Sequence, residues 1–293
     1  MDYVKPLGVV ESMLAGGTIK LNVPPRHLVI RGMLAGAYLG IATSMAVTVA
    51  VETGSWIAGS LLFPFGLALA ILLGTEIITG SFALLPCAAV ASRGQVGMSR
   101  VLANWGWVFL GNLLGATLYA VLFALCLTTA WDNAVPPVGA KLIAIAEAKT
   151  NYYAAHGSAG LLTVFTKAVL CNWMVSLAVV ASFASNSFGG KLLAIWGPTV
   201  LFFSQGFEHA VVNMFVIPVG MLLGIPMPAG IRLLSARTPQ MLTWAWGMNG
   251  ALSVVGATLA IFIAMNWGFQ FTLAGASGIY LIGLASLLTA EAR

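Results

Sequence analysis

Charged residues are scarce in this chain, and their scarcity excludes most soluble proteins. Only 7% of the 293 residues are charged, against 60% hydrophobic, and the mean hydropathy is +0.97. Soluble domains have about a quarter of their residues charged. The composition therefore predicts an integral membrane protein in a lipid bilayer. The net charge of +5 comes from basic residues that are scattered without a run, so it indicates membrane topology and no nucleic-acid partner.

Cysteine is also sparse. The sequence has three cysteines without CxxC spacing, all in or beside apolar segments: Cys87, Cys126 and Cys171. An odd number without paired spacing argues against a disulfide framework and against a zinc site. The sequence also lacks a nucleotide-binding fingerprint and a metal-ligand cluster, so we expect no cofactor, no metal and no enzymatic activity.

A signal-peptide pattern is missing as well. The first 25 residues lack a compact apolar region and hold several charged side chains, among them Asp2, Lys5, Glu11 and Lys20. This argues against a cleaved signal peptide. We expect an amphipathic helix on the membrane surface ahead of the first span.

The chain is rich in long apolar runs. Seven of them come close to the roughly 20 residues that cross a bilayer, at residues 28–51, 56–91, 101–130, 161–184, 190–224, 241–265 and 269–289. The second and fifth runs, of about 35 residues each, are too long for one straight helix and too short for two spans with a loop. Irregular backbone at membrane depth is tolerated only inside protein or along a cavity. Both runs are therefore predicted to be discontinuous helices.

These two long runs share a pattern. "GTEIITGSFALLP" (residues 74–86) and "GFEHAVVNMFVIP" (206–218) both follow G-x-E-x9-P without a gap. "RGMLAG" (31–36) and "KAVLCN" (167–172) place a basic residue three positions before a Leu near the start of the first and fourth spans. Three spans per half require the second half to enter from the opposite side of the membrane. The fold class predicted is all-α, an inverted repeat of three plus three spans whose site lies near the midplane. Chance recurrence of a small-x-acid pattern in a Gly-rich chain is the alternative.

Three stretches resemble the formate/nitrite transporter family: "GTEIITG" (74–80), "FTKAVLCNWMVSLAVV" (165–180) and "SQGFEHAVVNMFVIPVGMLLG" (204–224). The resemblance covers residues 1–224. It implies a homopentamer of aquaporin-like protomers, each with its own pore for small monovalent anions such as formate or nitrite. It also implies that the second-helix break gates the cytoplasmic side, and that the fifth-helix break presents a His at the centre of the pore.

The resemblance assigns roles residue by residue. It makes His209 the central His and Glu208 its neighbour, with Asn172 of the fourth span facing the ring. Thr79 in the second-helix break would contact the His or the passing anion. The hydrophobic constrictions correspond to Ile77, Ile78 and Phe202.

The family also places a lysine in the outer vestibule, ahead of the fourth-span Asn. Counting back sixteen residues without a gap from Asn172 reaches His156, whereas Lys149 in "AEAKTNYY" lies 23 residues before it and requires an insertion of seven. We favour Lys149, because a permanent cation attracts anions at every pH and His156 does so only when protonated.

A mechanism follows from the cost of moving charge. A bare anion in a dry constriction faces a Born penalty of order 20 kcal/mol in the idealised limit, so crossing as the neutral acid is cheaper. Histidine titrates near neutral pH, so His209 is predicted to give a proton to the substrate or hold one beside it. Half-helix N-termini favour anions there. Glu208 would repel an anion, so we expect it, and Glu76 by the repeat, to accept hydrogen bonds from loop N–H groups and hold the breaks in shape.

After Gly224 the resemblance changes. Residues 225–287 hold two apolar runs divided by "MNWGF", and they resemble, more weakly, the final spans of membrane domains related to spermidine synthases, above all in "WAWGMNGALSVVG" (244–256). We therefore divide the chain into a pore domain, 1–224, and an atypical C-terminal membrane segment, 225–293. Arg232 and Arg237 depart from the positive-inside pattern that otherwise places the N-terminus in the cytoplasm, with the protein in the cytoplasmic (inner) membrane. The sequence leaves open whether the chain has six or seven spans. It also leaves open whether the C-terminal segment reflects a fusion, a diverged terminus or an artificial recombination.

Three interpretations of function remain. The first is a channel or proton-coupled transporter for small monovalent anions, with the proton as second partner. The second, suggested by the C-terminal stretch, is a membrane-embedded domain of an enzyme or of a polyamine-related protein, although no soluble catalytic domain is evident. A transporter of a larger solute is disfavoured, because its pathway would need more polar lining than the sequence offers.

Overall fold

The structure, a computed structural model, describes residues 2–130 and 133–224. The described residues form eleven helices and no strand, apart from one isolated β-bridge between Tyr3 and Ser185. All eleven belong to one compact unit, Met1–Ile225. The expectation of an all-α protein is confirmed for this part. The two C-terminal runs and the proposed segment 225–293 lie outside the described residues.

Three of the described helices are long and apolar enough to span a membrane: α2 (Pro25–Thr53), α6 (Met98–Leu127) and α9 (Gly157–Ser182). They coincide with the runs predicted at 28–51, 101–130 and 161–184. Helices α2 and α6 pack backbone to backbone, because a Cβ added at Gly36 or Gly115 would press on the main chain of the other helix. Within a bilayer the hydrophobic effect does not bring helices together, so close van der Waals packing at small residues takes its place.

The second and fifth runs are interrupted, as predicted. The second forms α3 (Trp56–Leu62), α4 (Pro64–Leu72) and, after a break at residues 73–77, α5 (Ile78–Ala91). The fifth forms α10 (Phe188–Ser204) and, after a break at 205–209, α11 (Ala210–Gly224). Gly74 and Gly206 have φ values of +67° and +64°, the left-handed conformation that commonly ends a helix.

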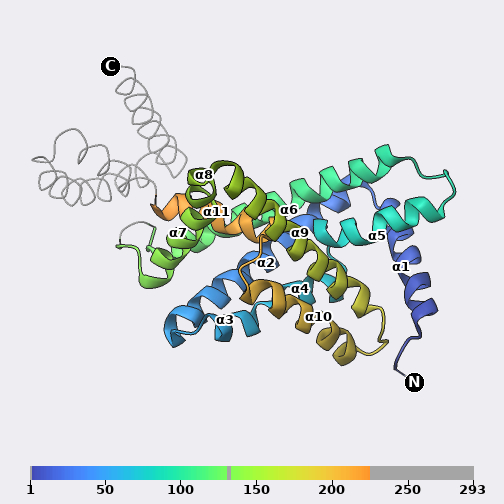
Figure 1. Cartoon of the computed structure of the whole chain (residues 1–293), viewed down its shortest axis with the longest axis horizontal. Coiled ribbons are helices and arrows are strands. Elements are labelled where there is room, and N and C mark those ends of the chain that lie inside the picture. Colours follow the sequence, from blue (N-terminus) through green and yellow to red (C-terminus); the bar gives the residue numbers. More distant parts are fainter. Residues whose placement is uncertain (1, 131–132, 225–293) are drawn as a thin grey trace, which may run out of the picture. The chain divides into compact units, whose positions relative to one another are not determined.

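The remaining helices lie at the ends of the described bundle (Figure 1). Helix α1 (Pro6–Leu21), the helix expected ahead of the first span, packs against α5, where Gly17 contacts the Leu84 carbonyl region. Helices α7 (Pro137–Lys149) and α8 (Asn151–Ala155) connect α6 to α9 and pack against α11 and α9 respectively. Figure 1 shows α1 at one end and α7 with α8 at the other, so each break has a covering helix nearby.

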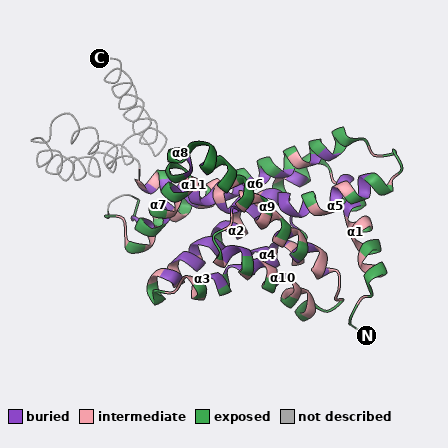
Figure 2. Ribbon diagram, in the orientation of Figure 1, coloured by how far each residue is buried: buried purple, intermediate pink, exposed green. Residues whose placement is uncertain are grey.

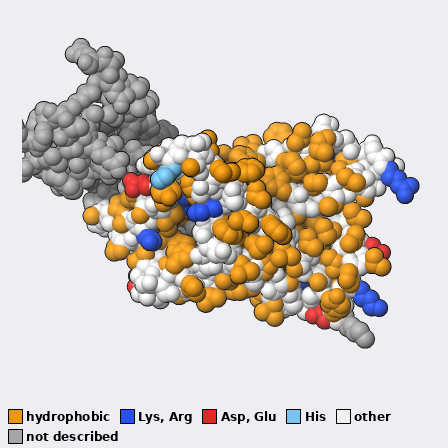
Figure 3. Space-filling model, viewed as in Figure 1, with side chains coloured by type: hydrophobic (Ala, Val, Ile, Leu, Met, Phe, Trp, Pro, Cys, Tyr) orange, Lys and Arg blue, Asp and Glu red, His pale blue; other side chains and the backbone are white. Residues whose placement is uncertain are grey.

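The surface is apolar between the ends. Buried residues follow the helix faces that meet inside the bundle (Figure 2), and one contiguous core contains Leu39, Phe63 and Phe215. Outside, hydrophobic side chains cover the middle of the face seen in Figure 3, and charged side chains gather toward its two ends. Helix α9 exposes a large apolar residue at every fourth position: Leu161, Phe165, Val169, Trp173 and Leu177. This surface suits contact with lipid or with another membrane-embedded chain.

Candidate functional site

The two helix breaks have the same backbone hydrogen bonds. In each, three consecutive N–H groups donate to equivalent carbonyls: Gly74, Thr75 and Glu76 to Ile71, Ala70 and Arg31, and Gly206, Phe207 and Glu208 to Phe203, Phe202 and Lys167. The last acceptor is in both cases the basic residue of the shared motif near the start of a long helix. Each break is therefore joined to the preceding long helix by an equivalent backbone hydrogen bond.

Glu76 is almost wholly buried and holds the first break to its surroundings. Its carboxylate forms an ion pair with Lys20 Nζ at the C-terminal end of α1. Asn112 of α6 completes the arrangement. Its Nδ2 donates to the carbonyls of Glu76 (2.8 Å) and Gly32 (2.9 Å), and its Oδ1 accepts the first N–H of α5, that of Ile78, at 2.9 Å. One buried amide thus joins α2, α5, α6 and the break.

Glu208 has equivalent surroundings in the second break. Its Oε2 accepts from Lys149 Nζ at 2.6 Å and from Asn213 Nδ2 at 2.9 Å, and its Oε1 accepts from the Tyr153 hydroxyl at 2.8 Å. Burial, followed by the neighbouring Glu208 carboxylate, raises the pKa of Tyr153, so this hydroxyl stays protonated and keeps donating.

The partners of both carboxylates differ from those expected. We predicted backbone N–H groups of the loops as donors, but the described donors to Glu76 and Glu208 are side chains of neighbouring elements. The reason is that the loop N–H groups already donate to helix carbonyls. Each carboxylate therefore fixes its break from outside, through α1 in one half and through α7 and α8 in the other.

His209 is buried at the N-terminal edge of α11, with 1% of its surface exposed. The Val212 backbone N–H lies 3.3 Å from Nδ1. A backbone N–H can only donate, so Nδ1 must be the acceptor, and the neutral ring then carries its hydrogen on Nε2. The Nε2 atom lies 3.5 Å from Thr79 Oγ1, which comes from the first turn of α5. The structure thus brings together the residues predicted for the two breaks, and the tautomer directs an N–H toward the opposite break.

The predicted constriction residues surround this contact. Phe202 stacks on the His209 ring at a centroid distance of 5.4 Å, and it meets Phe63 of α3–α4 edge-on at 5.7 Å. Ile77 and Ile78 are buried beside Thr79. Phe202, Ile77 and Ile78 each have at most 3% of their surface exposed, so the region on either side of the His209–Thr79 contact is apolar and closed.

Asn172 is not hydrogen-bonded to His209 in the described part of the chain. Its Nδ2 donates to the Ala168 carbonyl one turn earlier in α9, at 2.8 Å. Its Oδ1 is buried and has no hydrogen-bond partner among the described residues. An unpartnered buried acceptor is unusual and has a free lone pair for an incoming donor.

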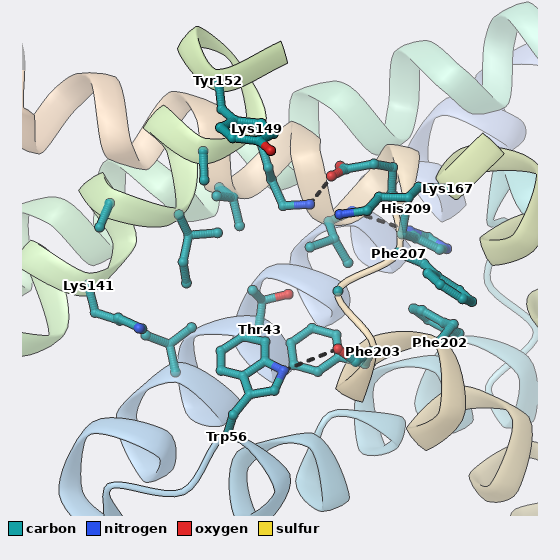
Figure 4. A pocket seen from close by; sticks show the side chains of 18 of the residues that line it. Thr43, Trp56, Lys141, Lys149, Tyr152, Lys167, Phe202, Phe203, Phe207 and His209 are labelled. Carbon is teal, nitrogen blue, oxygen red and sulfur yellow. Dashed lines mark hydrogen bonds and ion pairs between the residues drawn. The ribbon is translucent and has the colours of Figure 1, made fainter. Parts of the chain in front are cut away.

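A cavity of about 510 Å³ leads from α7 and α9 down to His209 (Figure 4). Three lysines line it, Lys141, Lys149 and Lys167, together with Glu208 and several aromatic side chains. Lys149 is thus a lining residue. His156 is exposed and does not line this cavity. Its Nδ1 lies 2.7 Å from the Tyr152 carbonyl.

Sequence reasoning missed Asn112, Tyr153 and Asn213, and it named Lys20 only as a charged residue of the N-terminal stretch. Asn112 had a visible signal, because a polar side chain inside a long apolar run commonly joins helices. Asn213, five residues after Glu208, belongs to the quoted motif. Tyr153 carried no signal, because its role depends on where α8 lies. No group of His, Cys, Asp and Glu that could hold a metal occurs within residues 2–130 and 133–224.

Comparison with known proteins agrees with this architecture. The family model described as formate/nitrite transporter matches residues 8–288. The chain is 33% identical over 230 residues to the uncharacterized transporter YrhG of Bacillus subtilis, covering 76% of this chain and 82% of that protein. It is 32% identical over 241 residues to a probable formate transporter of Methanothermobacter thermautotrophicus, covering 76% and 85%.

A solved pentameric formate channel with formate bound has the same fold, with a TM-score of 0.57 and 24% identity over 90% of this chain and 97% of that one. The family match runs past residue 224, where the resemblance traced in the sequence ended. The weaker similarity of residues 225–287 to spermidine-synthase-related domains stays a prediction. The chain therefore belongs to the formate/nitrite transporter family and is a multi-pass membrane transport protein, not an enzyme.

Proposed function

We propose that this protein is a channel or proton-coupled transporter for small monovalent anions, with formate and nitrite as the first candidates. The single observation that carries the proposal is the position of His209. Its Nε2 faces Thr79 of the opposite break at the closed end of a lysine-lined cavity. Relatives of this chain are named as a probable formate transporter, a formate channel and a nitrite transporter.

The proposed architecture is an inverted repeat of three plus three spans, assembled as a homopentamer. The matched hydrogen bonds of the two breaks support the repeat. The solved pentameric formate channel of the same fold supports the proposed pentamer, and the apolar stripe on α9 offers a face for lipid or for a neighbouring protomer. We place the protein in the cytoplasmic membrane with its N-terminus inside, from the distribution of basic residues.

In the proposed mechanism an anion enters the cavity, is drawn by Lys149 and takes up a proton from the surrounding water before the apolar constriction. Crossing as a neutral acid avoids the Born cost that a bare anion meets in a dry passage. His209 suits the role of holding a proton beside the substrate, since its neutral ring offers Nε2–H. Protonating Nδ1 would turn the Val212 contact into two opposed N–H groups. The neutral ring is therefore the resting form in this proposal, and Asn172 Oδ1 is a second group available to a protonated substrate.

We assign the vestibule cation to Lys149 in preference to His156. The Lys149 side chain lines the cavity and is only 12% exposed, whereas His156, between α8 and α9, contacts the Tyr152 carbonyl and does not line the cavity. Lys149 is also paired with Glu208, so its attraction for an anion is partly neutralised. Its charge draws anions most strongly together with the other lysines of the same cavity.

The test is flux in liposomes that contain the purified full chain, with formate or nitrite, across pH 5 to 8. We expect flux above that of empty vesicles that rises as the pH falls, and a changed pH dependence in His209→Asn. His156→Asn is the matched control, because that histidine is exposed and lies outside the cavity. Absence of anion or weak-acid flux would refute the transport proposal. Identical behaviour of His209→Asn and wild type would refute the proton role.

A further inference from the structure

We propose that the cavity above His209 is a binding site for amphipathic monocarboxylates, organic anions with one carboxylate and an aromatic or branched apolar body. Such an anion would occupy the cavity without passing the constriction. The binding site is inferred from the cavity alone. The expected consequence, that the bound carboxylate competes with the transported anion, rests on the proposed function.

The size of the cavity exceeds what a small anion needs. Its volume is about 510 Å³. Each water molecule takes about 30 Å³ of liquid, so an anion of three heavy atoms would fill a minor part of the space. Pockets for organic ligands typically have about 300–1,000 Å³. The space therefore fits a ligand with a carboxylate and a body of roughly the size of a benzene ring or larger.

One side of the cavity is a rigid aromatic wall. Trp56 stacks on Phe203 with centroids 5.3 Å apart and planes 11° from parallel, and Phe203 stacks on Phe63 at 3.9 Å and 12°. The indole N–H of Trp56 donates to the Phe203 carbonyl at 3.4 Å, which fixes the ring further. Phe207 is a further aromatic lining residue of the cavity. A preformed aromatic surface binds an apolar body with little loss of side-chain entropy.

The carboxylate of the ligand needs positive charge, and the cavity has more cationic than anionic side chains. Lys141, Lys149 and Lys167 line the cavity, and Glu208 is the one acid among its described lining residues. Three positive charges against one negative charge leave an excess of two. Both oxygens of Glu208 already accept hydrogen bonds, from Lys149 and two neutral donors. Lys141 and Lys167 therefore have no carboxylate partner within the described lining.

The arrangement separates the two kinds of surface. Figure 4 shows Lys149 and Lys167 pointing toward the same end of the cavity, near His209, while Trp56 and Phe203 lie together at another side. Lys167 Nζ also lies 5.8 Å above the Tyr153 ring, a cation–π contact that positions the ammonium group. A carboxylate at Lys167 would leave its apolar body to lie toward the aromatic wall. Formate and nitrite have no such body and would use only the cationic end.

A ligand of this size would stop at the constriction. Phe202 stacks on His209 at the inner end of the cavity, and it is 1% exposed. Ile77 and Ile78 are buried beyond the Thr79 contact. A ring would have to displace these packed side chains, and close-packed interiors resist such a change. The bound carboxylate would therefore plug the entrance of the pore.

The experiment is fluorine NMR of para-fluorobenzoate with the full chain in lipid nanodiscs, with para-fluorobenzyl alcohol as the uncharged analogue. We expect saturable binding of the benzoate and much weaker binding of the alcohol. Lys167→Gln should lower the affinity about tenfold, as expected for losing a charge-assisted hydrogen bond. Trp56→Ala should lower it as well. Lys191→Gln, at a lysine that does not line the cavity, should leave the affinity unchanged.

Lys141→Gln is a second charge variant, read in the same way if Lys167→Gln does not fold. No saturable binding, equal binding of the alcohol, or unchanged affinity in both lysine variants would overturn the inference. Flux is measured separately on the same preparations. Formate flux without benzoate binding would refute this site and leave the proposed function intact. Benzoate binding without any anion flux would refute the proposed function and leave the site intact.

Discussion

The amide of Asn112 offers the sharpest test of how the first break is held. Its side chain is 0% exposed and makes hydrogen bonds to three backbone groups: the Ile78 N–H and the carbonyls of Gly32 and Glu76. The perturbation is Asn112→Leu, which keeps a side chain of similar size and removes every polar atom. The break and the first turn of α5 then lose their link to α6.

The expected cost can be worked out group by group. The Gly32 carbonyl lies inside α2 and keeps its helical hydrogen bond. The Ile78 N–H and the Glu76 carbonyl make no other hydrogen bond within the described part of the chain. Each buried group left unsatisfied costs roughly 1–3 kcal/mol, so we expect Asn112→Leu to reduce the free energy of unfolding by roughly 2–6 kcal/mol.

Asn104 on the same helix is the matched control. It is also buried, at 4% exposed, but its Nδ2 makes one hydrogen bond, to the Lys20 carbonyl at 3.0 Å, and its Oδ1 has no partner among the described residues. The Lys20 carbonyl keeps the Val23 N–H as a second donor. Asn104→Leu removes one bond together with one unsatisfied oxygen, so its cost should stay near zero, within about 1 kcal/mol.

The assay is equilibrium unfolding of both variants and wild type in bicelles by steric trapping, at one protein concentration. The concentration must be fixed because assembly contributes to the stability of an oligomer. If Asn112→Leu is no less stable than Asn104→Leu, the amide does not hold the break, and the account of how α5 is positioned is wrong.

Three further predictions concern packing, charge and the N-terminus. Gly36→Ala should destabilise the protein by about 1–3 kcal/mol through overpacking against α6, whereas Gly106→Ala, where an added Cβ has nothing within 4 Å, should be neutral or stabilising in thermal unfolding. Lys149→Met should cost about 3–5 kcal/mol by leaving the Glu208 carboxylate buried without its cation, and adding Glu208→Gln should recover part of that loss in the same unfolding assay. Asp2 accepts hydrogen bonds from Ser187 and its neighbours, which lower the pKa of this carboxyl below 3.8. Its stabilising contribution is therefore present above pH 3.8 and lost as the pH falls through the lowered value, so at pH 7 Asp2→Asn should speed amide exchange in the loop between α9 and α10.

The breaks could be predicted from the sequence because their signals are local. G-x-E-x9-P gives a residue that tolerates positive φ and an acid at fixed spacing, and the breaks fall at Gly74 and Gly206. The two prolines of the pattern lie inside α5 and α11 instead of at the breaks. Thr79 and His209 were paired only through the family resemblance, since nothing local joins residues 130 positions apart.

The partners of the carboxylates could not be predicted in the same way. Lys149 and Tyr153 lie 59 and 55 positions before Glu208, and they meet it only because α7 and α8 pack over the second break. A donor that comes from a separate helix has no fixed spacing from its acceptor. The same holds for Asn112, which lies 36 positions after Glu76. The predicted spans at 241–265 and 269–289 lie outside the described residues and stay predictions.

Stability alone does not explain why each break holds a buried ion pair. Taking two charges out of water costs several kcal/mol per ion, and well-packed apolar residues often replace such a pair without loss. An apolar pair cannot fix its neighbours through directional hydrogen bonds. Glu208 holds Lys149, Tyr153 and Asn213 at fixed hydrogen-bond positions, and Glu76 holds Lys20 of α1. Each carboxylate is neutralised by its own lysine, so neither adds a net negative charge beside the buried ring of His209. A pathway for anions needs side chains held in fixed orientations without added negative charge. The two ion pairs meet this need, which favours a positional role for both glutamates over a role in contacting the anion.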